Sequence, residues 1–457
     1  MSKPQGAALY ESAKKIYPRE IGGRFDRLSR IATITLLGLF YAVPWLVMDD
    51  RQAVLFDLPA RKFYIFGLTL WPQDFPYLAL LLMILAYMLF FFTALGGRLW
   101  CGFACPQTVW TEIFIWMEQL TEGTRSQRMK LDNAPWSWTK LRRKGAKQLL
   151  WITFSLWTGF TFIGYFQPIR ELSGDIVALE VGGWTLFWGL FYGFATYGNA
   201  GYMREQVCKY MCPYARFQSA MFDKDTLIIS YDESRGEPRG GRKRSEDPKE
   251  KGLGDCIDCQ LCVQVCPTGI DIREGLQYEC IACAACIDAC DSIMDRMDYP
   301  RGLVRYTTEN AVQGKETRIL RPRVLVYATL LLVMVGGLVT SMAMRTPVIL
   351  DVIRDRNTLY RELPGGLIEN TYTLKLINQL NEARSFGVSV SGFEGVMLDG
   401  APDLVEVDAG GVLSLPVRVR AQRDNTYGIM NIEFSITAAD DPGVTVTEDS
   451  RFLGPTP

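Results

Sequence analysis

The chain of 457 residues contains no histidine. Histidine is the commonest metal ligand and the usual general base, so its absence excludes histidine-ligated haem and histidine-dependent catalysis. It also excludes a c-type haem site, which needs the sequence C-x-x-C-H. The formal net charge is only -1, so no overall charge directs the chain towards nucleic acid. Cysteine is therefore the residue type that carries the chemistry of this sequence.

The 12 cysteines occur in three groups. Two groups are pairs with the spacing C-x3-C-P, namely Cys101 with Cys105 and Cys208 with Cys212. The other eight cysteines lie in the range 256–290. This spacing is too tight and regular for a secreted disulfide framework, and in a reducing compartment it indicates metal sites.

Apolar segments predict a multi-pass membrane protein. Five of them approach the roughly 20 residues that a transmembrane helix needs, and they are residues 31–48, 77–95, 149–166, 184–203 and 324–344. The first follows a polar stretch without a small-residue cleavage site, so we interpret it as a retained anchor and not a signal peptide.

Lysine and arginine predict the orientation of these spans. They are concentrated in residues 1–30 and 96–148, whereas the loop between the third and fourth spans has only Arg170. By the positive-inside rule, residues 1–30, 96–148 and 204–323 are cytoplasmic and the tail after residue 344 is outside. All 12 cysteines then lie on the cytoplasmic side.

Residues 231–254 and the tail 345–457 differ in composition. Residues 231–254 are charged and rich in glycine and proline, which is typical of a mobile linker. The tail 345–457 contains TYTLKL, FGVSVSG, LSLPVRVRA and IMNIEFSITA, which are rich in β-forming residues and separated by turn residues. Short strands at this spacing predict a β-sandwich. Because the tail has no cysteine or histidine, we expect a docking or stabilising module.

The eight-cysteine run has the spacing C-x2-C-x2-C-x3-C twice, which is the bacterial ferredoxin pattern for two 4Fe-4S clusters. Three thiolates in a tight loop wrap one cube, and the fourth, after a short helical step, binds the other cube. The second run ends in Asp291 where the usual pattern has proline. The alternatives are zinc, which tolerates a looser arrangement, and free thiols. The predicted ligand sets are Cys256, Cys259, Cys262 and Cys290 for one cluster, and Cys280, Cys283, Cys286 and Cys266 for the other.

Each C-x3-C-P pair predicts a helix start at the membrane edge. Proline suits the first helical turn, so Cys105 and Cys212 should cap helices that begin at Pro106 and Pro213. A thiol there lies at the positive end of the helix dipole, which predicts a lowered pKa. If the second and fourth spans are neighbours, four soft ligands converge, and soft thiolates select Cu(I), zinc or iron–sulfur centres. The alternatives are small buried hydrophobic residues or a redox-active dithiol pair.

Several stretches together resemble the FixG/RdxA/CcoG family, the cytochrome c oxidase accessory proteins of the bacterial inner membrane. They include KIYPREIGGRF, RKFYIFGLTLWPQDF, GRLWCGFACPQTVWTEIFIW, REQVCKYMCPYARFQSAMFDKDTLIISYD and the cysteine run with YPRGLVRY, so the resemblance covers essentially the whole chain. The C-x3-C-P motifs alone are less specific, because they also occur in membrane ferredoxins that handle quinol electrons.

The resemblance implies a membrane-bound polyferredoxin that reduces Cu(II) to Cu(I) for assembly of the cbb-type oxidase. It places two 4Fe-4S clusters on the eight cysteines and the copper-handling, catalytic role on Cys101, Cys105, Cys208 and Cys212, with an iron-containing third centre as the alternative. The implied partners are the oxidase assembly machinery or a copper carrier, a cytoplasmic electron donor and possible self-association as a homodimer, and no nucleic acid. The rival functions are a quinol-linked electron-transfer subunit and a non-enzymatic copper chaperone or scaffold.

The predicted fold is therefore a multidomain membrane protein. It combines an α-helical bundle of about five spans, a ferredoxin-like α+β domain with two clusters and a C-terminal immunoglobulin-like β-sandwich. Its predicted divisions are 1–30 (cytoplasmic segment), 31–230 (four-helix membrane region), 231–254 (linker), 255–323 (cluster domain), 324–344 (fifth span) and 345–457 (periplasmic β domain).

Overall fold

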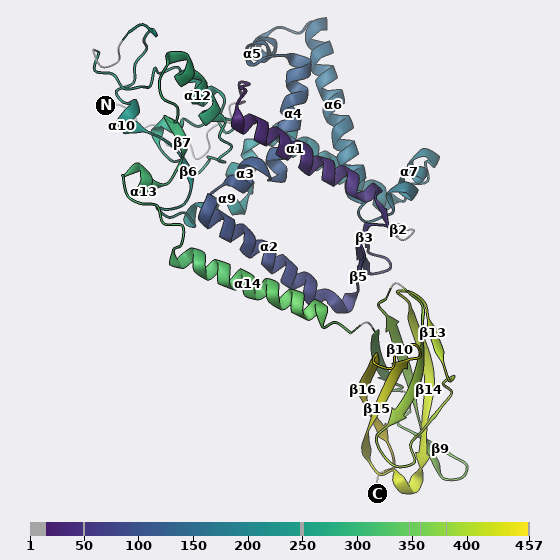
Figure 1. The fold of residues 1–457 in the computed structure, drawn as a ribbon. Coiled ribbons are helices and arrows are strands. Elements are labelled where there is room, and N and C mark those ends of the chain that lie inside the picture. The colour runs from purple at the N-terminus through teal and green to yellow at the C-terminus, as the bar shows by residue number, and fades with distance from the viewer. Residues whose placement is uncertain are drawn as a thin grey trace, which may run out of the picture. The chain divides into compact units, whose positions relative to one another are not determined.

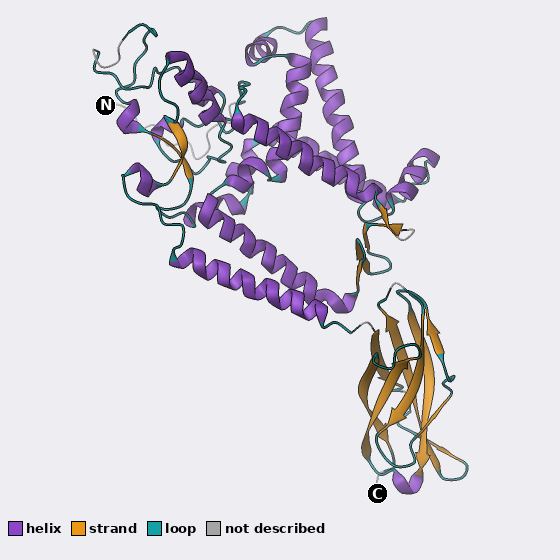
Figure 2. Ribbon diagram, in the orientation of Figure 1, coloured by secondary structure: helices purple, strands orange, loops and turns teal. Residues whose placement is uncertain are grey.

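The computed structural model describes residues 15–48, 51–246, 251–346, 348–356, 358–380 and 382–455. The chain divides into two compact units, Met1–Gly336 and Gly337–Pro457, called unit 1 and unit 2 below. Unit 1 is mainly helical and unit 2 is built from strands (Figures 1 and 2). Residues 1–14 of the predicted cytoplasmic segment and residues 247–250 of the predicted linker lie outside the described residues.

Helices dominate unit 1. The longer ones are α1 (Arg24–Ala42), α2 (Phe75–Gly96), α4 (Pro106–Glu122), α6 (Trp138–Ile163), α8 (Gly183–Thr196) and α12 (Ala285–Met297). The shorter ones are α3 (Leu99–Phe103), α5 (Arg125–Asn133), α7 (Ile169–Ala178), α9 (Pro213–Ala220), α10 (Glu233–Gly236), α11 (Leu261–Gln264) and α13 (Glu309–Val312). Helix α14 (Pro322–Ala343) connects the two units.

Three helical segments are long and apolar enough to cross a membrane, among the residues that the structure describes. They are Arg24–Trp45, Phe75–Gly96 and Pro322–Ala343, and they agree with the first, second and fifth predicted spans. The fourth predicted span forms part of a pair, Ile169–Ala178 and Gly183–Met203, that is bent by 102°. The third lies in the second half of α6, whose first half is basic. The protein is thus membrane-anchored, and the number of five spans stays a prediction.

Helices α4 and α6 run side by side, with α5 at one end (Figure 1). Helix α6 begins at Trp138 because the Ser137 side chain accepts a hydrogen bond from the Lys140 backbone N–H, which caps the helix. Phe114 of α4 and Trp151 of α6 form the buried core between them, and Trp151 Nε1 donates to the Phe114 carbonyl at 3.1 Å. The core fixes the position of α4, whose first residue follows Cys105.

The cysteine-rich part of unit 1 begins earlier than predicted. Strand β6 (Ile228–Tyr231) pairs antiparallel with β7 (Val304–Thr307), so the small sheet takes one strand from each side of the cysteine run. The predicted mobile linker is also wrong for residues 231–242. Tyr231 is buried, Arg235 is paired with Asp255, and Arg242 donates to the Tyr299 hydroxyl at 3.0 Å. Charge therefore serves here to attach the segment to the cluster domain.

Two small sheets follow α1 in unit 1. Their strands are β1 (Val47–Met48) with β2 (Arg51–Gln52), and β3 (Val54–Asp57), β4 (Lys62–Ile65) and β5 (Leu68–Leu70).

Unit 2 consists of two antiparallel sheets around one apolar core, which confirms the predicted β-sandwich. One sheet has the order β12-β14-β10-β8 with β9 also paired to β10, and the other has the order β13-β11-β15-β16. The four quoted sequence stretches lie in β10, β11, β14 and β15. The strands are β8 (Val348–Arg354), β9 (Arg361–Leu363), β10 (Leu367–Asn378), β11 (Arg384–Ser391), β12 (Met397–Asp399), β13 (Val405–Val407), β14 (Val412–Gln422), β15 (Ile429–Ala438) and β16 (Thr445–Leu453).

Candidate metal centres

The eight clustered cysteines surround two adjacent hollows. The first hollow is lined by Cys256, Cys259, Cys262 and Cys290, together with Arg273. The second is lined by Cys266, Cys280, Cys283 and Cys286, with Cys262 at its boundary. The fourth cysteine of each run thus faces the hollow that contains the first three of the other run. The assignment of these residues as cluster ligands stays a prediction.

The two cysteine loops share an unusual backbone. Asp258 and Gln260 flank Cys259 with φ of 49° and 55°, and Ala282 and Ala284 flank Cys283 with φ of 55° and 61°. Residues other than glycine rarely adopt this left-handed conformation, and it is concentrated at binding sites. It closes each loop around its hollow, and α11 and α12 begin directly afterwards, so Cys262 and Cys286 lie on the first helical turn.

The donor set of each hollow fits an iron–sulfur cube. Burial raises the pKa of Cys262 to about 11 and that of Cys290 to about 12, because a buried thiolate is poorly solvated, and a bound cation would offset that cost. The Val304 backbone N–H also donates to the Cys290 sulfur, and such hydrogen bonds tune the potential of a cluster. In the described part of the chain, no group of three or more Cys, Asp or Glu side chains is arranged to hold a single ion. A cube is larger than one ion and holds its ligands farther apart, so four thiols around each hollow are compatible with a cube.

Both C-x3-C-P pairs cap helices as predicted. Helix α4 begins at Pro106 after an extended Cys105, and α9 begins at Pro213 after an extended Cys212. The predicted low thiol pKa is wrong for Cys105. Burial raises its pKa, although the backbone N–H groups of Gln107 and Thr108 donate to the sulfur and lower it. Desolvation therefore outweighs the helix N-terminus at this position.

The structure brings the four membrane-edge cysteines, Cys101, Cys105, Cys208 and Cys212, into one group, which we call the edge thiols. Burial raises the pKa of Cys101 to about 12, and Cys105, Cys208 and Cys212 each contribute to the rise because they lie close by. Cys208 lies in the π-helical segment Val207–Met211, which follows a first π-helical segment, Tyr197–Met203. Such irregular turns occur often at functional sites.

The first C-x3-C-P motif lies against the second cysteine loop. A Cβ at Gly102 would lie 2.8 Å from the Ala282 carbonyl oxygen and 2.9 Å from that of Ile281, so the two loops touch backbone to backbone. Arg98 is buried and donates to the carbonyl oxygens of Tyr278, Cys280 and Ala215, which joins the first C-x3-C-P motif to the cysteine run and to α9.

Sequence reasoning missed Arg98 and Gly102 as site residues. The sequence pattern assigns Arg98 only to the basic segment 96–148 and assigns no role to Gly102. Their position inside GRLWCGFACP is the available signal, because a buried arginine and a crowded glycine both indicate close packing of backbones.

A buried ion network supports the same region. Glu118 of α4 is fully buried and is paired with Arg204 at 2.9 Å, Arg128 at 3.4 Å and Lys15 at 3.2 Å. Burial alone would raise the pKa of Glu118, but Arg204 and Lys15 outweigh burial and lower it to about 2. The network holds α4, α5 and the segment before Cys208 together.

Fold and site together define an iron–sulfur electron-transfer protein that is anchored in a membrane. Matching family models support this class: a 4Fe-4S dicluster domain matches residues 203–309 and a 4Fe-4S binding domain matches residues 78–122. A third model, the IG-like fold at the C-terminal of FixG, matches residues 338–455.

The chain belongs to the FixG/RdxA/CcoG family. It is 38% identical to the nitrogen fixation protein FixG of Rhizobium meliloti (strain 1021), over 84% of this chain and 80% of that protein. It is 38% identical to the protein RdxA of Cereibacter sphaeroides, over 99% of this chain and 95% of that protein. A crystal structure of a FixG-related protein from Vibrio parahaemolyticus matches 24% of this chain and 98% of its own, with 33% identity and a TM-score of 0.22.

Proposed function

We propose that this iron–sulfur protein reduces Cu(II) to Cu(I) at the edge thiols and thereby serves the assembly of a cbb-type cytochrome c oxidase. The observation that carries the proposal is the backbone contact between Gly102 and residues Ile281 and Ala282. This contact joins the first C-x3-C-P motif to the second cysteine loop, which supports electron transfer between a cysteine-lined hollow and soft sulfur donors. Iron–sulfur clusters supply one-electron transfer when they are bound there.

The edge thiols would favour the reduced metal. Thiolates are soft ligands and prefer Cu(I) to Cu(II), so binding there assists the gain of one electron by each copper ion. The thiols lose their protons when copper binds, because the thiolate is the ligand. Arg98 is a positioning residue that keeps the first C-x3-C-P motif against the cysteine run.

The proposal includes an orientation. In it the cysteine-bearing segments face the bacterial cytoplasm, the protein lies in the inner membrane and unit 2 is periplasmic. Copper then enters from a carrier and leaves as Cu(I) towards the oxidase assembly machinery. Charge asymmetry around the predicted spans supports this orientation.

Anaerobic copper reduction by the purified full-length protein tests the proposal. Protein reduced with dithionite and then desalted is mixed with Cu(II) and a Cu(I)-specific chromophore. We expect rapid Cu(I) formation, and a slower rate at unchanged iron content in Cys101→Ser and Cys208→Ser. Because thiols alone can reduce Cu(II), protein with oxidised clusters is the control. Equal Cu(I) yields from reduced and oxidised protein would remove the catalytic role.

A second candidate is a third iron–sulfur centre at the edge thiols. It is favoured by the match of a 4Fe-4S binding domain to residues 78–122, which include Cys101 and Cys105. It predicts about 12 iron ions per chain, and about eight in Cys101→Ser and Cys208→Ser. If the edge thiols bind only copper, the wild type and both variants would each contain about eight iron ions per chain.

A further inference from the structure

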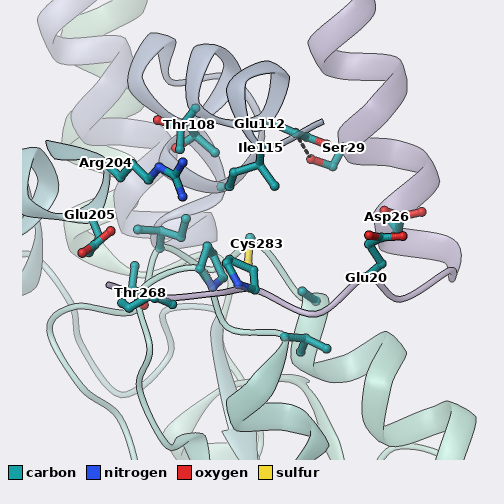
Figure 3. Close-up of a pocket in the computed structure, with 18 of the residues that line it drawn as sticks. Glu20, Asp26, Ser29, Thr108, Glu112, Ile115, Arg204, Glu205, Thr268 and Cys283 are labelled. Atoms are coloured by element: carbon teal, nitrogen blue, oxygen red, sulfur yellow. Dashed lines mark hydrogen bonds between the residues drawn. The ribbon is translucent and has the colours of Figure 1, made fainter. Parts of the chain in front are cut away.

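A cavity of about 190 Å³ lies between the edge thiols and the cluster domain in unit 1. Helix α4 contributes Thr108, Glu112 and Ile115 to one wall, and Cys283 of the second hollow lies on another (Figure 3). Cys208 also lines the cavity. The cavity therefore borders one edge thiol and one predicted cluster ligand.

The lining suits a small ring with polar substituents. It is mixed, with Ile21, Phe25, Ile115 and Trp116 among the apolar groups and Glu112 among the polar ones. An apolar cavity of about 150 Å³ is known to hold one benzene ring, so this one has room for a single substituted ring and none for a nucleotide cofactor. Ligand pockets combine apolar walls with polar groups that fix the orientation of the ligand, and this cavity has both.

The cavity lies beside a helix that is long and apolar enough to cross a membrane. Helix α1, part of the apolar segment Arg24–Trp45, contributes Ser29 to its wall. On the same helix Leu28, Ile31 and Ile34 are exposed, as expected for side chains that face lipid. A cavity bordered by such a helix suits a ligand that is dissolved in the membrane.

Glu112 is the group in the cavity that can exchange a proton. Its carboxylate accepts hydrogen bonds from Ser29 Oγ and Thr33 Oγ1, both at 2.9 Å. Burial raises the pKa of Glu112 even though these two hydrogen bonds lower it. The other charged and titratable groups around the cavity are Asp26 and Arg30 on α1, Arg19 and Glu20 before it, Arg204 and Glu205 after α8, Cys208 and Cys283.

We propose that this cavity binds the head group of a membrane-soluble hydroquinone, and that Glu112 accepts one of its protons. The inference rests on the proposed function in one respect, since it takes bound iron–sulfur clusters as the oxidant. It names the chemical class of the electron donor.

Oxidation of one hydroquinone breaks two O–H bonds and yields a quinone, two electrons and two protons. Iron–sulfur clusters, held by the cysteines of the two hollows, would supply the one-electron acceptors for these two electrons. One proton goes to the Glu112 carboxylate and the other to water. Cys283 lines both the cavity and the second hollow, so it would join the hydroquinone site to a cluster bound there.

Two measurements on the full-length protein in detergent test the proposal. The first is binding of menadione by equilibrium dialysis against protein-free detergent, which does not depend on clusters. We expect saturable binding to wild type and its loss in Ile115→Trp, which fills the cavity. Equal binding to both proteins would overturn the site.

The second measurement is anaerobic bleaching of the cluster absorbance by menadiol. We expect Glu112→Gln to slow bleaching by about 100-fold, as for loss of a general base, with Glu112→Asp intermediate. Glu309→Gln, at an exposed position on α13, is the matched control and should bleach at the wild-type rate. Dithionite should bleach every variant equally, which shows that the clusters are intact.

The outcomes separate the two proposals. Clusters that dithionite reduces but menadiol does not would overturn the hydroquinone site and leave copper reduction untouched. Menadiol bleaching without Cu(I) formation would overturn copper reduction and leave the hydroquinone site untouched. Equal rates in wild type and Glu112→Gln would remove the proton-accepting role.

Discussion

Gly102 lies inside the first C-x3-C-P motif and has no room for a side chain. A Cβ there meets the backbone of Ile281 and Ala282, which cannot rotate away as a flexible side chain could. At the residue scale this glycine therefore determines how closely the edge thiols approach the second cysteine loop.

We expect Gly102→Ala to destabilise the protein by about 1–3 kcal/mol, the usual cost of overpacking. It should also lower the rate of Cu(I) formation, because it separates the two loops. Gly145→Ala on α6 is the control: no atom lies within 4 Å of its added Cβ, and a helical alanine is favoured over glycine by up to about 1 kcal/mol. Thermal unfolding and the copper assay provide the measurement, and equal behaviour of the two variants would contradict the contact.

At the element scale, the Glu118 network joins α4, α5 and the segment before Cys208. The cationic neighbours lower the pKa of Glu118 from 4.5 to about 2. A carboxyl group with a depressed folded-state pKa stabilises the fold above its unfolded pKa, and that contribution is lost as pH falls. The network should therefore weaken progressively from about pH 4.5 down to about pH 2.

Glu118→Gln should cost about 3–5 kcal/mol at neutral pH, because Arg128 and Arg204 remain buried without their counter-charge. Its unfolding free energy should change less than that of wild type between pH 4.5 and 2. Glu309→Gln breaks only an exposed pair with Lys224 at 3.9 Å and should stay within about 0.5 kcal/mol of wild type. Denaturant unfolding at several pH values measures both effects, and a near-neutral Glu118→Gln would disprove the network's role.

Elements that depend on local chemistry were predictable from the sequence. Pro106 and Pro213 specify helix starts, and alternation in β10 and β14 specifies strands with one buried face. Two features join segments that are far apart in the chain: the pairing of β6 with β7 and the contact of Gly102 with Ala282. No local sequence pattern predicts such contacts. The predicted low pKa of Cys105 is wrong for the same reason. The burial of this thiol depends on tertiary packing, whereas its position at a helix N-terminus is a local feature.

At the scale of the whole molecule, unit 2 has a core of its own. Its buried side chains, among them Tyr372, Phe386, Phe434 and Phe452, all come from residues 348–452. A domain with a complete core can fold alone.

We therefore expect the fragment 345–457 to unfold cooperatively and to contain no iron, since it has no cysteine. Within this fragment, Phe434→Ala should lower the free energy of unfolding by about 3–5 kcal/mol. Phe434 is fully buried, and its ring centroid lies 5.1 Å from that of Tyr372. Circular dichroism during thermal unfolding tests both statements. A fragment without a cooperative transition would show that unit 2 depends on the rest of the chain.

The central claim is that the eight cysteines from Cys256 to Cys290 bind two iron–sulfur cubes. Iron and acid-labile sulfide analysis of anaerobically purified full-length protein, combined with electron paramagnetic resonance after reduction, tests it most directly. Two cubes predict at least about eight iron and eight sulfide ions per chain and a signal from reduced 4Fe-4S clusters. Stoichiometric zinc without sulfide, or thiols that all react freely with alkylating reagents, would contradict the claim.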